Sequence, residues 1–353
     1  MNVSAPNAAA PSSAQLAPST RTEPARRAMS AVVHHQYGEP DVLALGEVNL
    51  PVPGDDDVLI RVVAAGVSIG DHHIVTGKPY LVRLSPFGGF PRPKHTVPGA
   101  AMSGRIAAVG ARVTGLQVGD EVFGQALNGA FAEFLVMPAK LVAHKPKSLS
   151  FEDAAAVPWG TTALQGLRDA GQVRAGERVL VNGASGAVGT WAVQLAKSLG
   201  AHVTAVCSTR NIELVRSLGA DEVIDYTKSD FVESGARYDV LMDMAGNRTL
   251  SDCKRVLNAG GRYVPCSGGG GDWLGPFVRI IGALLVFSFG GKRVKMFMQK
   301  LNAADLVVMR ELVESGAIRP VVERIWSLLE VGAALKHVGA GHSQGLSVVR
   351  IAG

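Results

Sequence analysis

Apolar residues recur along this chain in two different rhythms. From residue 30 to about residue 150, short alternating or wholly apolar runs are interrupted by glycine or proline every few positions, and helical spacing is rare. This pattern predicts short strands joined by turns in a β-rich, barrel-like domain. The predicted strands lie in SAVVHHQYG, VLALGEVNL, DVLIRVVAAGV, SGRIAAVGARV and FAEFLVMPAKLVAHKP.

The second rhythm starts near residue 177, where short apolar runs alternate with segments of helical spacing. The apolar runs have the composition of parallel strands covered on both faces, and they are RVLVN, HVTAVC, DEVIDY, YDVLMDM and GRYVPCSG. The segments between them, GTWAVQLAKSLG, NIELVRSLG and TLSDCKRVLN, have helical spacing. We therefore predict an α/β fold in which a doubly wound parallel sheet follows the β-rich domain.

The C-terminal part of the chain returns to the first rhythm after one very apolar stretch. Residues 273–289 (WLGPFVRIIGALLVFSF) are fewer than the roughly 20 that a membrane-spanning helix needs, and they include Arg279 and Pro276. We expect a buried strand, a lid or a subunit contact here and no membrane span. We interpret 284–289 as a strand at the end of the sheet, which favours a homodimer. A helix at 303–315 and the strands VVERIW and LSVVRI follow, and we assign these to the first domain.

Composition limits the class of protein. With 353 residues, 47% hydrophobic and 18% charged, the chain has the size for two domains and the balance of a soluble globular protein. The net charge of +5 suits an anionic ligand, but lysine and arginine form no long run, so nucleic-acid binding is not expected. Three isolated cysteines (Cys207, Cys253 and Cys266) argue for a reducing, cytoplasmic location and against a structural zinc.

The first 28 residues are rich in alanine, proline and serine and contain no apolar block. They lack the core of a secretory signal, and we expect a disordered extension over 1–28. Three arginines and a single acid also fit an organelle transit peptide, which stays open as an alternative although the prolines break an amphipathic helix.

A glycine-rich turn carries the most specific chemistry in the sequence. Gly183, Gly186 and Gly189 follow the strand RVLVN and open a helix. In such a fingerprint the first glycine permits the tight turn, the second lets a pyrophosphate approach the backbone, and the third lets helix and strand pack closely. The N-terminus of the helix then attracts the anion. We predict dinucleotide binding; a turn without a ligand is the alternative.

The end of the second strand indicates which dinucleotide is bound. An NAD site presents an acid to the ribose about 20 residues after the glycines, whereas this strand is followed by Ser208, Thr209 and Arg210. Two hydroxyls and a guanidinium suit a 2′-phosphate, so NADPH is the predicted cofactor. Alternatively, Arg210 is only a solvated residue in the first turn of the next helix.

At this point the sequence resembles the medium-chain dehydrogenase/reductase family, specifically its zinc-free branch of quinone oxidoreductases and enoyl reductases. The resemblance covers residues 29–353 and rests on SAVVHHQYGEPDVL, VGDEVFG, AAAVPWGTTALQGL, the glycine turn and SLGADEVIDY. It implies a GroES-like catalytic domain at 29–152 and 291–353, with a Rossmann NADP-binding domain at 153–290.

The resemblance also implies individual cofactor residues. Tyr226 becomes a second partner for the 2′-phosphate, and Thr162 lies near the nicotinamide. The rest of the cofactor is lined by the glycine turn, with Ser185, Ala187 and Val188 beside its glycines, and by Gly246 and Ser267.

The same comparison indicates that no metal is bound. Zinc-dependent members carry a cysteine where this chain has Ser68, and their Gly-His-Glu ligand motif appears here as Gly99-Ala100-Ala101. Both ligand positions are therefore lost. We also expect no joint site at His72 and His73, because neighbouring histidines on an extended segment point to opposite faces.

Zinc-free chemistry favours a conjugated acceptor. Alcohol or ketone chemistry concentrates charge on one oxygen and needs a Lewis acid, whereas a quinone or an enone or enal spreads the charge. We predict an NADPH-dependent oxidoreductase that reduces a quinone or an α,β-unsaturated carbonyl. Ser68, Asp71 and Tyr80 are the candidate catalytic donors, although Ser68 and Asp71 also fit turn residues and Tyr80 a packed ring. An alcohol dehydrogenase with an unconventional metal and an NADPH-binding protein without turnover are the alternatives.

Overall fold

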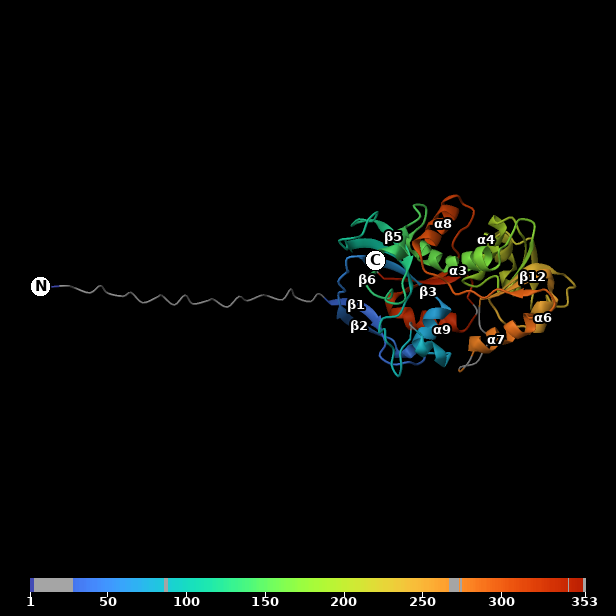
Figure 1. Ribbon diagram of the computed structural model, residues 1–353, viewed down its shortest axis with the longest axis horizontal. Coiled ribbons are helices and arrows are strands. Elements are labelled where there is room, and N and C mark those ends of the chain that lie inside the picture. The colour runs from blue at the N-terminus through green and yellow to red at the C-terminus, as the bar shows by residue number, and fades with distance from the viewer. Residues whose placement is uncertain (3–27, 86–87, 267–272, 274, 342, 352–353) are drawn as a thin grey trace.

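The computed structural model describes residues 1–2, 28–85, 88–266, 273, 275–341 and 343–351. Two bodies built on different sheets lie side by side (Figure 1), which confirms the predicted α/β architecture of a GroES-like domain and a Rossmann domain. The first body contains residues from both ends of the chain. None of the helices described has the length and apolar character needed to cross a bilayer.

The first body is a seven-stranded sheet that is mostly antiparallel. Its central strand β3 pairs along one edge with β4, with two register shifts, and along the other edge first with β6 and then with β15. Alternate β3 residues face a core that contains Val58, Ile60 and Val62. The strands are β3 (Asp57–Val67), β4 (Ala101–Val109), β5 (Glu121–Gln125), β6 (Phe134–Pro138), β7 (Val142–His144), β14 (Val322–Ser327) and β15 (Leu346–Arg350). A separate hairpin joins β1 (Ala28–Val33) to β2 (Ala44–Asn49).

The first body also contains helices that the sequence pattern does not predict. They are η1 (Pro40–Val42), α1 (Ile69–Thr76), η2 (Tyr80–Leu84), η3 (Ala139–Leu141), η7 (Leu328–Glu330) and α9 (Val331–Gly339). In α1, Ser68 caps the N-terminus and Gly77 ends the helix at a φ of 63°, a left-handed value that favours glycine. The segment containing His72 and His73 is therefore helical, and our expectation of an extended segment there is wrong.

The second body is a six-stranded parallel sheet in the order β10-β9-β8-β11-β12-β13. Successive residues of β8 face opposite sides, because Val179 and Val181 pack in one core while Leu180 packs in the other. Both faces are thus covered, as in the predicted doubly wound fold. The strands are β8 (Arg178–Asn182), β9 (His202–Cys207), β10 (Glu222–Asp225), β11 (Tyr238–Asp243), β12 (Leu257–Pro265) and β13 (Arg293–Val294).

Helices connect these strands, cover the sheet or join it to the first body, and one of them, α2, packs on β3 and β4 of the first sheet. They are α2 (Phe151–Ala156), η4 (Val157–Trp159), α3 (Gly160–Gln165), the π-helical turn η5 (Gly166–Ala170), α4 (Gly189–Ser198), η6 (Thr209–Asn211), α5 (Ile212–Ser217), α6 (Leu250–Arg255), α7 (Gly275–Phe287) and α8 (Ala303–Glu314). The order of the strands reverses at β8, since β9 and β10 extend the sheet in one direction and β11 to β13 in the other. Ligands of doubly wound sheets bind at the carboxyl ends of the strands near such a switch point.

The apolar stretch before β13 corrects one prediction. The strand expected at 284–289 is wrong: residues 275–287 form α7, at the rim of the molecule beside α6 (Figure 1). A fully apolar run is compatible with either element, and here the helix covers the sheet with Ala283 and Phe287. The homodimer prediction thereby loses the strand on which it depends. The edge of the sheet is β13, which begins beyond residue 290, where we end the predicted cofactor domain.

Candidate active site

The glycine turn between β8 and α4 is shaped by its three glycines. Gly183 has a φ of 87° directly after β8. A Cβ on Gly189 would lie 2.1 Å from the Gly183 carbonyl oxygen, so only glycine permits this packing. On Gly186, a Cβ would meet only that same oxygen, at 3.7 Å, which leaves open space in front of the backbone. None of the side chains described caps α4, so its N-terminus is available to an anion.

The C-terminal segment holds this turn from one side. The Gly345 N–H donates to the Ser185 carbonyl at 2.8 Å, and the Asn211 amide donates to the Ser185 hydroxyl at 2.7 Å. Gln344 in turn donates to the Asn211 side chain. Ala187 and Val188, the other predicted members of the turn, lie half-buried beside these contacts. Sequence reasoning missed Asn211 and Gln344, because the fold joins two segments that are distant in the chain.

The four residues predicted to hold a 2′-phosphate lie at two adjacent strand ends. Cys207, the last residue of β9, is in register with Asp225, the last residue of β10. Ser208, Thr209 and Arg210 therefore leave the sheet next to Tyr226, and all but the half-buried Ser208 are exposed. The structure thus brings these predicted residues together.

The neighbouring strand also supplies a carboxylate that a search after the second strand does not reveal. Thr209 Oγ1 donates to Asp225 Oδ2 at 2.6 Å, and Thr227 Oγ1 donates to Asp225 Oδ1 at 2.7 Å. The hydrogen bond from Thr209, more than any other contact, holds the pKa of Asp225 below its usual value. Asp225 is thus an ionised group that fixes two hydroxyls at this edge.

A buried polar cluster lies at the carboxyl ends of β8, β11 and β12. Asp243 is 1% exposed, and it accepts hydrogen bonds from the Gly246 N–H at 2.9 Å and from Asn182 Nδ2 at 2.8 Å. Tyr263 and Arg279 donate to its other oxygen at 2.8 and 2.9 Å. This cluster fixes the loop of Gly246 and ties α7 to the sheet. Ser267, another predicted cofactor residue, lies outside the described residues.

The predicted nicotinamide residue Thr162 lies on α3, near the junction of the two bodies. Trp159 immediately precedes α3, and its ring lies 3.9 Å from the position of a Cβ on Gly70. The Ser68 hydroxyl lies 3.3 Å from the same position. The start of α3 and the start of α1 therefore approach each other where the domains meet.

Ser68 and Asp71 bind each other at the N-terminus of α1. The Ser68 N–H and the Ser68 hydroxyl each lie 2.8 Å from Asp71 Oδ2, and the Asp71 N–H donates back to Ser68 Oγ at 3.3 Å. This reciprocal arrangement is a capping box. Burial raises the pKa of Asp71 to about 6, although hydrogen bonds from Ser68 and from the Ala100 N–H oppose the shift.

These contacts test whether zinc fits. Positions 68 and 100 are where zinc-dependent members carry ligands, and the structure brings both against the Asp71 carboxylate. A serine hydroxyl and a backbone N–H are not the N, S or carboxylate donors that zinc prefers. Among the residues described, no three His, Cys, Asp or Glu side chains are grouped to hold one ion. The residues present do not form a zinc site.

The two histidines of α1 do not converge either. His72 and His73 have ring centroids 6.1 Å apart with nearly perpendicular planes, and His72 packs against Gly339 of α9. Burial lowers the pKa of both imidazoles.

Tyr80 is part of an aromatic and cationic stack. Its ring lies 4.9 Å, edge to face, from Trp273, which precedes α7 in the other body. The Arg83 guanidinium lies 4.7 Å from the Tyr80 centroid and 4.4 Å from that of Tyr37. Tyr80 is therefore a packed ring, and it also bridges the two bodies.

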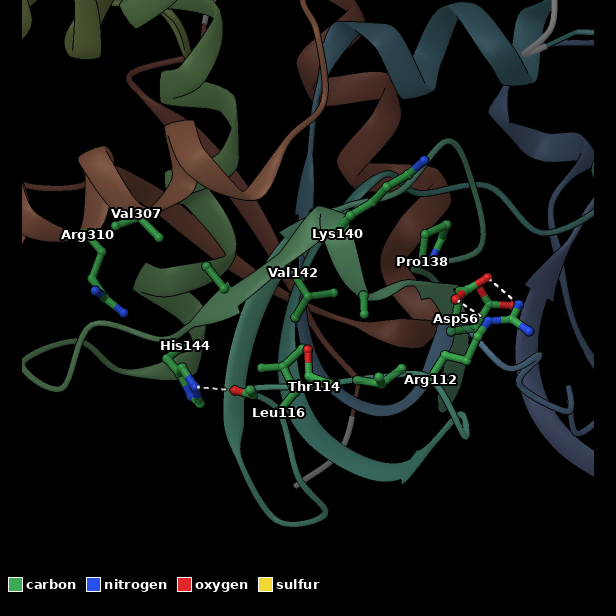
Figure 2. Close-up of a pocket in the computed structure, with 15 residues that line it drawn as sticks. Asp56, Arg112, Thr114, Leu116, Pro138, Lys140, Val142, His144, Val307 and Arg310 are labelled. Atoms are coloured by element: carbon green, nitrogen blue, oxygen red, sulfur yellow. Dashed lines mark hydrogen bonds and ion pairs between the residues drawn. The ribbon is translucent and has the colours of Figure 1, made fainter.

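A groove of about 740 Å³ lies away from all of these residues (Figure 2). It is lined by Arg112, which pairs with Asp55 and Asp56, and by His144 and by Val307 of α8. Most of its charged groups are already paired, and none of the predicted site residues that the structure describes lines it. We therefore place the candidate site at the junction of the bodies, not in this groove.

Two family models match the chain. Residues 54–147 match "Alcohol dehydrogenase GroES-like domain", and residues 218–349 match "Zinc-binding dehydrogenase". The ligand positions 68 and 100 lie outside the second match. Together with the relatives below, these matches show that the chain belongs to the medium-chain dehydrogenase/reductase family, in its quinone oxidoreductase-like branch. It is an oxidoreductase with a nicotinamide cofactor.

The relatives match over most of the chain. The chain is 36% identical to the 2-methylene-furan-3-one reductase of Solanum lycopersicum, over 91% of this chain and 79% of the relative. It is 34% identical to the chloroplastic NADPH-dependent alkenal/one oxidoreductase of Arabidopsis thaliana, with the same coverage. The solved quinone oxidoreductase of Coxiella burnetii superposes with a TM-score of 0.81 at 27% identity, covering 92% of this chain and all of that one.

Proposed function

We propose that this protein is an NADPH-dependent oxidoreductase that transfers hydride to a quinone or an α,β-unsaturated carbonyl compound without zinc. The observation that carries the proposal is the contact between Ser68, Asp71 and Ala100, since the two lost ligand positions meet at one buried carboxyl group that is already satisfied. A reaction that needs no Lewis acid is the chemistry that this arrangement supports.

The open glycine turn supports cofactor binding. Gly183, Gly186 and the uncapped start of α4 would hold the pyrophosphate, while Ser208, Thr209, Arg210 and Tyr226 would hold the 2′-phosphate. When bound, the nicotinamide supplies a hydride to the acceptor. Asn211 donates to Ser185 Oγ, which holds the Ser185 hydroxyl in one position and leaves its proton free for a ligand, whereas Thr209 donates its proton to Asp225 and only its side-chain position is fixed.

The pair formed by Ser68 and Asp71 is the proposed proton source for an alkene acceptor. A carboxyl group with a pKa of about 6 exchanges its proton near neutral pH. The Ser68 hydroxyl, 2.8 Å from Asp71 Oδ2, can pass that proton onward. We propose that Tyr80 orients a planar acceptor through its ring beside Trp273.

The names of the relatives support a conjugated acceptor, because an alkenal/one oxidoreductase and a methylene-furanone reductase both imply a carbon–carbon double bond beside a carbonyl. The division into domains at 29–152, 153–290 and 291–353 and the cytoplasmic location remain predictions. A homodimer is a further prediction, which sedimentation of the purified protein can check.

A substrate screen tests the proposed function directly. Oxidation of NADPH is followed by its absorbance with quinones, alkenals and enones in parallel, and with simple ketones and alcohols as controls. We expect turnover with at least one conjugated class and none with the simple ketones. Tight NADPH binding without oxidation by any acceptor would contradict the proposal and favour a non-catalytic NADPH-binding protein.

A further inference from the structure

Asn211 is a buried polar residue whose side chain does not cap its own helix. It stands at the N-cap position of α5, where asparagine commonly accepts a hydrogen bond from the first turn. Within the part of the chain that the structure describes, the Asn211 side chain makes no such bond, although the residue is only 4% exposed. Buried amides need partners for their donors and their acceptor, and those of Asn211 come from elsewhere in the fold.

The amide nitrogen of Asn211 contacts two serine hydroxyls, and both serines are predicted cofactor residues. Asn211 Nδ2 donates to Ser185 Oγ at 2.7 Å and to Ser208 Oγ at 3.2 Å. Ser185 belongs to the glycine turn, which would hold the pyrophosphate, whereas Ser208 follows β9 at the proposed 2′-phosphate site. One buried nitrogen therefore lies between the two segments that would bind different phosphates of one cofactor.

The direction of these hydrogen bonds determines what the two serines can do. A hydroxyl that accepts a hydrogen bond keeps its own proton for another partner. Among the residues described, neither Ser185 nor Ser208 donates a side-chain hydrogen bond to the protein. Both protons are therefore left for an acceptor outside the chain, and the oxygens of a phosphate are strong acceptors.

Gln344 fixes the orientation of the Asn211 amide from the segment that leads into β15 of the first body. The Gln344 side-chain nitrogen donates to Asn211 Oδ1, so Oδ1 faces this segment and Nδ2 faces the serines. The segment is itself attached to the glycine turn, because Gly345 forms a parallel bridge with Gly186 and donates its N–H to the Ser185 carbonyl at 2.8 Å. The first body thus sets the amide that binds both serines of the second.

We propose that Asn211 is a positioning residue that directs the hydroxyl protons of Ser185 and Ser208 towards the pyrophosphate and the 2′-phosphate of NADPH. This role rests on the proposed function, because it requires NADPH at the glycine turn. It also assigns selectivity to the pair of hydrogen bonds. Ser208 would contact a group that NADPH alone carries, whereas Ser185 would contact a group that NADH and NADPH share.

Binding of NADPH and NADH to variants of these residues tests the role, with the fluorescence of the nicotinamide as the readout. Ser208→Ala should weaken NADPH at least about tenfold and leave NADH unchanged, because one charge-assisted hydrogen bond is lost. Ser185→Ala should weaken both cofactors by a similar factor. Asn211→Ala should weaken NADPH at least about tenfold and NADH by less, since only one of its two branches serves NADH.

Combined variants separate positioning from a structural role. Without Asn211, the Ser208 hydroxyl has no fixed direction, so adding Ser208→Ala to Asn211→Ala should weaken NADPH by no more than about threefold further. A residue that only supported the fold would give additive losses and would weaken NADH and NADPH equally. Additive losses, or equal weakening of the two cofactors by Asn211→Ala, would overturn the proposal.

Asn211→Asp keeps the shape of the side chain and inverts its hydrogen bonding. A carboxylate only accepts, so both serine hydroxyls would donate to it and no longer to the cofactor. We expect a folded protein, as circular dichroism can show, that binds NADPH at least about 100-fold more weakly than the wild type, because two charge-assisted hydrogen bonds are lost. This ratio should persist at high salt, which screens repulsion by the new charge. Binding equal to that of the wild type, at low or at high salt, would overturn the proposal.

Asn258→Ala is the matched control. Asn258 is a half-buried amide that donates to Asp239 at 2.8 Å near the amino ends of β11 and β12, at the opposite edge of the same sheet. Binding of both cofactors should be unchanged, and a loss equal to that of Asn211→Ala would contradict a specific role. Wild-type protein that binds neither cofactor would refute the proposed function together with this role. NADPH binding with additive losses would refute the role of Asn211 alone.

Discussion

Two helix N-termini near the domain junction are finished in opposite ways. At α4 no side chain in the described part of the chain caps the helix, and the turn before it is made of small residues with open space at Gly186. At α1 the N-terminus is closed by the capping box of Ser68 and Asp71, and both residues are 4% exposed. Both ends offer N–H donors and a positive dipole, but among the residues described only α1 has a side chain bound to its first turn.

This difference indicates that the two helix N-termini have different roles. An uncapped N-terminus keeps its donors for an external anion, which suits a pyrophosphate. A capped N-terminus satisfies itself and instead fixes side chains, which suits a buried carboxyl group that must keep one position and a raised pKa. The four predictions below test the comparison, from the largest expected effect to the smallest.

Replacing glycines in the turn should separate folding from cofactor binding. Gly189→Ala places a Cβ 2.1 Å from the Gly183 oxygen, so we expect a loss of about 3 kcal/mol or more in the free energy of unfolding. Gly186→Ala meets no close atom, so stability should change by less than about 1 kcal/mol while NADPH binding weakens at least about tenfold, through lost backbone approach. Urea unfolding and cofactor titration measure both quantities. Equal destabilisation by the two variants would show that the space at Gly186 is not reserved for a ligand.

Asp71 should make stability depend on pH. Burial raises its pKa from the usual 3.8 to about 6 in the folded protein. Its stabilising contribution is therefore present below about pH 4 and is lost as the pH rises through about 6. Relative to Asp71→Asn, the wild type should therefore lose on the order of 2 to 3 kcal/mol across this window.

A half-buried cap of the same kind provides the control for Asp71. Asp153 accepts a hydrogen bond from Ser150 at the start of α2 but is not buried. We expect the difference in unfolding free energy between the wild type and Asp153→Asn to stay nearly constant when it is measured at several pH values. A pH-independent difference between the wild type and Asp71→Asn would contradict a raised pKa.

Arg210 should discriminate between the two nicotinamide cofactors. Arg210→Ala should weaken NADPH by about 1.5 to 3 kcal/mol through loss of a charge-assisted contact, and should leave NADH nearly unchanged. Arg216→Ala is the control, because Arg216 pairs with Glu213 on α5. Titration of each variant with both cofactors gives the comparison, and equal weakening of NADPH and NADH would remove Arg210 from the phosphate site.

Chelation should have the smallest effect of all. Because Ser68 and Ala100 occupy the ligand positions and Asp71 is bound to Ser68, we expect full activity after dialysis against a chelator. Activity that is lost on dialysis and restored by zinc would favour the alternative of an alcohol dehydrogenase with an unconventional metal.

Local patterns predicted the two sheets and the glycine turn well, because strand composition and glycine spacing are properties of neighbouring residues. They failed at α7, because an almost continuous run of apolar residues has no periodicity by which a helix can be told from a strand. They also failed at α1, whose eight residues are too few for a clear helical repeat, although Ser68, Asp71 and Gly77 supply its start and stop signals.

The amino-acid sequence alone determined the class of cofactor and the loss of the zinc ligands, since both depend on which residue types stand at short, fixed spacings. Only the tertiary structure decided which groups meet across the chain. Asp225 reaches Thr209 because two parallel strands end in register, and Gln344 reaches Asn211 because the C-terminal segment lies against the glycine turn. Such contacts depend on the path of the backbone, and they cannot be predicted from the spacing of the two residues along the chain.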